Sequence, residues 1–157
     1  MNRAQRLAAV ATSLSAAPFV FAGCAAPASG FEQAIPPAVI ASDANIADVA
    51  ISTSSNLGGS GFWIRIYLLD VSDDALVGSI DAALVSAYRA APSKPTDVTL
   101  DVKQAPRSAD DSLTMPGLKL SDAVVDALGL RGHTLDRTIE LSIDELVERY
   151  GAWGAAG

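Results

Sequence analysis

Apolar and polar residues alternate with period two along three segments of the chain, and this pattern predicts three strands. The segments are 46–53, 62–71 and 96–104. Alternation places successive side chains on opposite faces of a sheet, so each strand has one apolar face. The residues predicted to share this face are Val49, Ile51 and Thr53 in the first segment, Phe62, Ile64, Ile66 and Leu68 in the second, and Val98, Leu100 and Val102 in the third.

The second strand also carries a mixed opposite face. Trp63, Arg65, Tyr67 and Leu69 share that side. It is amphipathic, which indicates that another part of the chain partly covers it. One candidate is Trp153 near the C-terminal end, folding back over Trp63. In the alternative, Trp63, Tyr67 and Trp153 form an exposed aromatic patch for a partner.

A change from period two to a helical period marks a long helix after Val71. Ser72 is placed to cap it, and Asp73 and Asp74 fall in its first turn, where the helix dipole favours acids. Pro92 ends the helix. The predicted buried stripe is formed by Leu76, Ile80, Ala83, Leu84, Ala87 and Tyr88.

The C-terminal third contains two similar units, each a short extended stretch followed by a short capped helix. Residues 118–121 lead into a helix over 122–128, closed by Gly129. Residues 139–142 lead into a helix over 143–150, where Ser142 and Glu145 form a capping box. The predicted fold class is therefore α+β: a small, mainly antiparallel sheet with a β-β-α-β core, helices packed on one face, and two C-terminal strand–helix units. Only the order of elements resembles ferredoxin-like or BON-like domains.

The N-terminal pattern is that of an export signal. Arg3 and Arg6 precede an apolar stretch that ends at Gly23. Residues 1–23 are predicted to be a signal peptide, 24–44 a flexible tether rich in small residues and proline, and 45–157 a single domain.

Phe21-Ala22-Gly23-Cys24 resembles the lipobox of bacterial lipoproteins, in which small residues precede a cysteine. The resemblance implies that the Cys24 thiol receives a diacylglyceryl group and that the signal is cut just before it. Two acyl chains give a durable anchor, because each buried CH₂ contributes about 0.8 kcal/mol. The Ala- and Asp-rich, Lys-poor composition is similar to that of short actinobacterial lipoproteins. Two alternatives remain open: ordinary cleavage after Ala26-Pro27-Ala28, or an uncleaved membrane helix.

Charge limits the partners of the mature chain. The formal charge is −7, and removal of Arg3 and Arg6 leaves nine basic residues against 18 acidic ones, or −9. An acidic surface disfavours nucleic acid and anionic headgroups, since both require basic patches. No nucleic-acid partner is expected.

Candidate chemistry is sparse. His133 is the only histidine, no G-x-S-x-G elbow is present, and His133 is predicted to be a solvated loop residue. Gly58-Gly59-Ser60-Gly61 leads into a strand rather than a helix, which favours a hairpin over a phosphate loop. Asp110-Asp111 lacks the spacing of a calcium loop. We expect no catalytic residue, no metal and no cofactor.

These patterns predict a lipoprotein held by Cys24 on the extracytoplasmic side of the cell membrane. Its domain is expected to be a non-enzymatic module that interacts with another envelope protein. A small-molecule or lipid-binding lipoprotein is the alternative, and a hydrolase comes third. A cavity between helix and sheet would favour the small-molecule alternative; an uncovered Trp63–Tyr67 face would favour the interaction module.

Overall fold

The computed structural model describes residues 30–56, 59–135 and 137–154. Five strands form one mixed sheet in the order β1-β2-β3-β5-β4. The strands are β1 (Ile46–Asn56), β2 (Gly59–Leu68), β3 (Asp97–Gln104), β4 (Thr134–Leu135) and β5 (Thr138–Ser142). The helices are α1 (Gly30–Ser42), α2 (Asp73–Ala90), α3 (Asp122–Ala127) and α4 (Ile143–Tyr150).

The sheet is mainly antiparallel, as predicted. Three of its four strand pairs are antiparallel, and β2 and β3 are parallel because α2 carries the chain from the end of one to the start of the other. Gly59, Ser60 and Gly61 of the glycine-rich segment belong to β2, so they begin a strand and do not open a helix. The predicted α+β class is confirmed.

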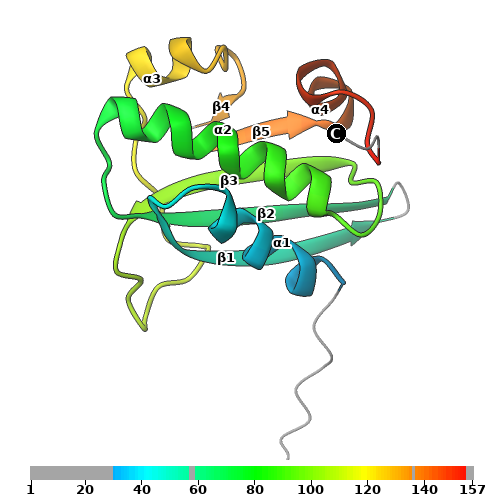
Figure 1. The fold of residues 1–157 in the computed structure, drawn as a ribbon, viewed down its shortest axis with the longest axis horizontal. Coiled ribbons are helices and arrows are strands. Elements are labelled where there is room, and N and C mark those ends of the chain that lie inside the picture. Colours follow the sequence, from blue (N-terminus) through cyan, green and yellow to red (C-terminus); the bar gives the residue numbers. More distant parts are fainter. Residues whose placement is uncertain (1–29, 57–58, 136, 155–157) are drawn as a thin grey trace, which may run out of the picture.

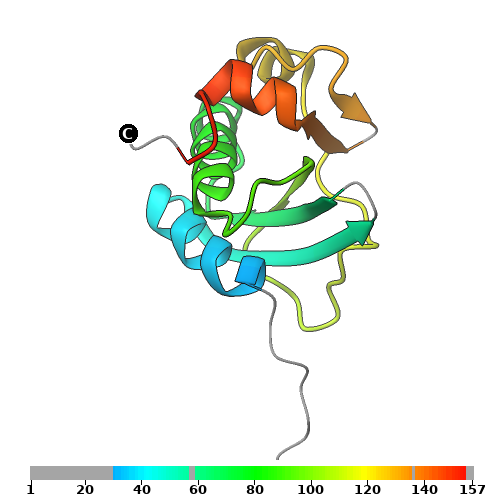
Figure 2. The same ribbon diagram turned by 90° about the vertical axis from the view of Figure 1, so that its right-hand side faces the viewer.

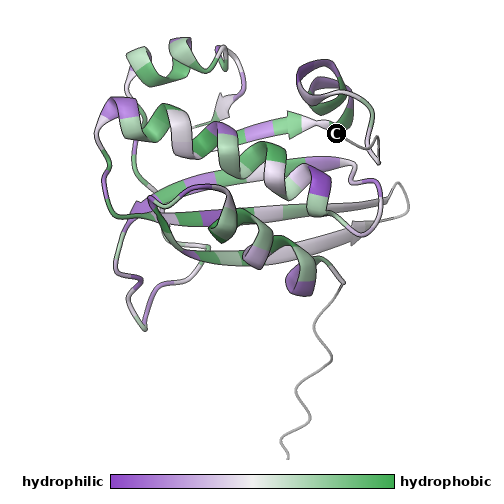
Figure 3. Ribbon diagram, viewed as in Figure 1, coloured by the Kyte–Doolittle hydropathy of each residue, from purple (hydrophilic) through white to green (hydrophobic). Residues whose placement is uncertain are grey.

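One side of the sheet, here called the helix face, is covered by α1 and α2 (Figures 1 and 2). The apolar strand positions predicted from the alternation lie on this side: Phe62, Ile64, Ile66, Val98 and Leu100 are at most 1% exposed. In α2, Leu76, Ile80, Leu84 and Tyr88 are buried against them. In Figure 3, stretches of the α2 ribbon and of the central strands have the green colour of hydrophobic residues.

The predicted tether is wrong for Gly30–Ser42, which form α1. Phe31, Ile35 and Val39 recur every four residues and are buried in the core. Pro36 and Pro37 lie inside this helix, where each removes a backbone donor. Packing of the buried stripe against α2 and β1 outweighs this loss, so the folded domain begins by residue 30 rather than residue 45.

The C-terminal third agrees with the prediction in its second unit and departs from it in the first. β5 leads into α4, and the capping box between Ser142 and Glu145 is present. Residues 118–121 lead into α3 without joining the sheet as a strand, although Leu118 donates its N–H to the Val102 carbonyl at 2.7 Å. A two-residue strand, β4, stands between α3 and β5.

Trp153 does not cover Trp63. It packs against the core on the helix face, close to α4, and that prediction is wrong. The opposite side of the sheet, the loop face, is covered over part of its area by residues 105–117, the 105–117 loop (Figure 2).

Candidate functional site

The strand register shows which side chains share the loop face. Residues directly opposite one another in neighbouring strands point to the same side of a sheet. One row across the sheet is Ser52, Trp63, Thr99 and Glu140, and the next is Ala50, Arg65, Asp101 and Thr138. The 105–117 loop lies over Arg65 and Asp101 and leaves the first row more open.

Arg65 and Asp101 form a buried ion pair at the centre of the loop face. The Arg65 Nε donates to one Asp101 oxygen at 2.6 Å and its Nη2 to the other at 2.5 Å. The side chains are 0% and 1% exposed. Such a bidentate ion pair offsets the cost of burying both charges only when its geometry is good and the remaining guanidinium N–H groups also have acceptors.

Those remaining donors hold the 105–117 loop. The Arg65 Nη1 donates to the Ser112 carbonyl at 2.6 Å, and Nη2 also donates to the carbonyls of Leu113 and Met115. Asp111 accepts from Arg65 Nη1 at 3.2 Å. Each loop carbonyl covered by this arrangement therefore has a charged donor in place of water.

Asp111 gathers a second set of contacts at the same place. It accepts from the Tyr67 hydroxyl at 2.9 Å and pairs with the Lys103 ammonium. Lys103 lowers the pKa of Asp111, helped by the hydrogen bond from Tyr67. Burial raises the pKa of Tyr67, and the Asp111 carboxylate raises it further. Asp111 thus acts as an anionic anchor for the loop.

The far end of the loop approaches β3 too closely for a side chain. A Cβ on Gly117 would lie 2.9 Å from the Val102 carbonyl oxygen and 3.1 Å from the Asp101 Cβ. Only glycine fits this approach without displacing backbone. Gly117 therefore fixes where the loop leaves the sheet and where the neighbouring hollow begins.

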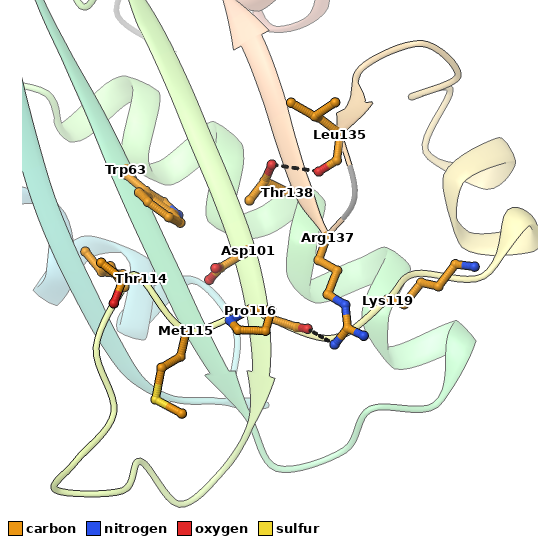
Figure 4. Close-up of a pocket in the computed structure, with 11 residues that line it drawn as sticks. Trp63, Asp101, Thr114, Met115, Pro116, Lys119, Leu135, Arg137 and Thr138 are labelled. Carbon is orange, nitrogen blue, oxygen red and sulfur yellow. Dashed lines mark hydrogen bonds between the residues drawn. The ribbon is translucent and has the colours of Figure 1, made fainter.

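Beside the loop lies an open hollow of about 460 Å³ (Figure 4). Trp63 forms one side of it, Met115 and Pro116 belong to the loop side, and Leu135 to the β4–β5 side. Lys119 and Arg137 lie at the end of the hollow away from Trp63. Asp101 lines the hollow as well, but its charge is matched by Arg65. The hollow therefore combines an apolar and aromatic lining with two cations.

A second hollow of about 540 Å³ lies further across the same face. Leu135 lines both hollows, and Thr99 of the second is directly opposite Trp63 of the first. Its charged lining is acidic apart from His133: Asp97, Glu140 and Glu145. We call the two hollows together the loop-face groove.

His133 is less solvated than predicted. Its side chain is 33% exposed, and Nδ1 lies 3.0 Å from a Glu145 carboxylate oxygen. The Ser142 hydroxyl donates to the other Glu145 oxygen at 2.7 Å. A serine hydrolase needs the histidine between serine and acid, whereas here the acid stands between them. This group caps α4 and does not form a nucleophile relay.

The carboxylate pairs have structural contacts. Asp73 and Asp74 lie in the first turn of α2, and Asp73 accepts from the Ser121 hydroxyl at 2.8 Å. Asp111 is occupied by Arg65, Tyr67 and Lys103. In the described ranges no group of three or more His, Cys, Asp or Glu residues is arranged to hold a metal ion.

Cys24 and the lipobox lie outside the described residues. Within the described part of the chain, no helix is both long and apolar enough to cross a membrane.

The fold and the groove define a small α+β domain with a loop-covered, charged sheet face. No protein-family model, curated protein or solved structure matches this chain.

Proposed function

We propose that the chain is an extracytoplasmic lipoprotein anchored in the cell membrane by a lipid on Cys24. Its domain is a non-enzymatic binding module for another envelope component. The anchor is supported by the lipobox, in which Cys24 follows small residues at the end of an apolar segment. The apolar stripe of α1 begins at Phe31, so few residues separate the domain from that anchor. A short connection holds the binding surface close to the membrane.

The observation that carries the binding role is the loop-face groove. It is open, apolar and aromatic in the middle, and charged at both ends. Leu135, at its centre, is 64% exposed. Met115, which lines the first hollow from the loop side, is 48% exposed, and a group of exposed large apolar side chains is a feature of a surface that meets a partner. The capping arrangement of His133 and Glu145 supports a binding module over a hydrolase.

A small-molecule or lipid ligand is the second candidate. The volume of the first hollow, about 460 Å³, lies within the range of ligand pockets, roughly 300–1,000 Å³. However, such pockets usually enclose most of the ligand, whereas both hollows here are open on the loop face. The space between helices and sheet is filled by side chains such as Ile35, Ile80 and Leu100, each 0% exposed. The open groove fits a protein partner better.

The anchor is tested by replacing the lipid acceptor. In a bacterial host that processes lipoproteins, the wild-type chain should sediment with membranes and show the mass of a diacylated N-terminal cysteine. Cys24→Ala should remain unprocessed or leave the membrane. A mature wild-type N-terminus at Ser29 would contradict the anchor and support ordinary secretion.

A further inference from the structure

The two ends of the loop-face groove carry opposite charge. At one end Lys119 and Arg137 are both exposed. Arg137 donates one bond, from Nη1 to the Gly117 carbonyl at 2.9 Å, and neither cation is paired with a carboxylate of the described residues. In the described ranges, five of the seven other Lys and Arg residues are in ion pairs. These two are therefore available to an anion from outside.

The other end is acidic. Asp97 and Glu140 are exposed and line the second hollow, with no ion pair to a described residue. Glu140 lies in the same row of the sheet as Trp63, so the acid and the indole are on one face. The groove is thus polarised along its length, with an apolar centre at Trp63 and Leu135.

Strand geometry sets the distance between the charged ends. Arg137 precedes β5 and Glu140 lies within it, three residues later. At about 3.3 Å per residue, this separation is on the order of 10 Å. Asp97, the other acid, is directly opposite Ser142, five residues after Arg137, so the acidic end extends to about 16 Å from Arg137. In an extended peptide, side chains at positions i, i+2 and i+4 point to the same side, and positions i and i+4 are about 13 Å apart, between these two separations.

We propose that the loop-face groove binds an extended segment of a partner protein with an acidic residue and a basic residue four positions apart and an apolar residue midway. The acid contacts Lys119 and Arg137, the apolar side chain lies on Trp63 and Leu135, and the base contacts Asp97 and Glu140. The inference rests on the proposed function, because that function makes the ligand a protein. Charge complementarity and spacing select this occupant over a purely acidic or purely basic one.

The test uses the anchored full chain in lipid nanodiscs and fluorescent peptides, with binding followed by anisotropy. The probe is the blocked heptapeptide Ser-Glu-Thr-Leu-Thr-Lys-Ser. Three comparison peptides carry two Glu, two Lys or two Gln at the charged positions. The probe should bind at least about fivefold more tightly than any of the three, because each of them loses at least one of the two exposed charge pairs.

Reversing one charge on the protein should change which of the peptides binds most tightly. Lys119→Glu should weaken binding of the probe and strengthen binding of the two-Lys peptide. Glu140→Lys should weaken binding of the probe and strengthen binding of the two-Glu peptide. Arg89→Glu and Asp74→Lys are matched controls, because both residues are exposed on α2 away from the groove. These controls should leave all four affinities unchanged.

Two results would overturn the inference. One is equal binding of the probe and the two-Gln peptide; the other is an effect of Lys119→Glu no larger than that of Arg89→Glu. Either result leaves the proposed function standing if a partner in cells still contacts Leu135. Loss of both peptide binding and partner contact at Leu135 would remove the proposed function as well.

Discussion

The two faces of the sheet are built from different chemistry. On the helix face, β2 contributes Phe62, Ile64 and Ile66 to a hydrocarbon core under α1 and α2. On the loop face, the same strand contributes Trp63, Arg65 and Tyr67. Arg65 is as fully buried as Ile64, at 0% exposure, yet its cover is a loop held by hydrogen bonds. One strand thus supports a dry core on one side and a polar, partly open surface on the other.

Because of this difference, we expect the helix face to determine the stability of the domain and the loop face to determine binding. The helix face has many apolar contacts that do not depend on any one direction, and burial contributes about 25 cal/mol per Å² of apolar surface. The loop face depends on a few directional bonds to Arg65 and Asp111. Those bonds hold one half of the face closed while the other half stays open as the groove. Perturbations of the two faces should therefore differ in size and in kind.

The largest expected effect comes from a charge on the helix face. Ile80→Asp puts an unpaired carboxylate at a position that is 0% exposed. The cost is several kcal/mol, comparable to the whole stability of a small domain, about 5–15 kcal/mol. Urea unfolding followed by circular dichroism should show little or no folded protein.

Ser86→Asp in the same helix is the control. Ser86 is only partly buried, and an acid near the end of α2 costs about 0.5 kcal/mol against the helix dipole. Equal stabilities of the two variants would show that the buried side of α2 has been misassigned.

A smaller loss is expected from the ion pair on the loop face. Arg65→Met leaves the buried Asp101 without its partner, and breaking such a pair costs about 3–5 kcal/mol. Hydrogen exchange should rise most in residues 105–117, because their carbonyls lose the guanidinium donors.

The double variant Arg65→Met/Asp101→Leu separates charge burial from loop anchoring. It should recover much of the free energy of unfolding, because no uncompensated charge remains. The 105–117 loop should still exchange quickly. Full recovery of both quantities would mean that Arg65 does not hold the loop.

The smallest effect is a pH dependence confined to the loop. The pKa of Asp111 is lowered by Lys103. The stabilisation of the loop by the Asp111 carboxylate is therefore present above the ordinary Asp pKa of about 3.9, and it is lost as the pH falls through the lower pKa of the folded state. Loop protection, measured by hydrogen exchange corrected for intrinsic rate, should fall below about pH 4.

Asp111→Asn should have weaker loop protection at neutral pH and no such acid step. Burial raises the pKa of Asp101, which acts in the opposite sense, so the comparison between wild type and Asp111→Asn isolates Asp111. An identical acid step in both proteins would contradict the assigned anchor.

The sequence was sufficient to predict the helix face and the hairpin of the first two strands. Period-two and helical patterns identify Ile64, Leu100 and Ile80 as core because water exclusion acts on every such residue in the same way. It also predicted the capping box of Ser142 and Glu145, which is a local signal. These features depend on neighbours in the chain or on hydrophobicity alone.

The rest depends on distant partners. Arg65 lies in an apolar strand and Asp101 lies between Leu100 and Val102, so the sequence places a charged residue in each of two buried strands. Nothing in the local sequence indicates that the two residues pair across β2 and β3. Pro36 and Pro37 are typical of a helix break, and they outweighed the local signal for α1, the recurrence of Phe31, Ile35 and Val39 every four residues. The groove was missed because Lys119, in the segment before α3, and Leu135, in β4, are far apart in the sequence.

We expect partners to bind the loop face and not the helix face. The most direct measurement is photo-crosslinking in cells from the full anchored chain, with a photoreactive residue at Leu135 or, as control, at Asp74 on α2. Both positions are exposed. A discrete crosslinked species should form from position 135, should disappear with Cys24→Ala, and should be absent from position 74. Crosslinks of equal yield from both positions, or from position 74 alone, would contradict the loop face as the binding surface.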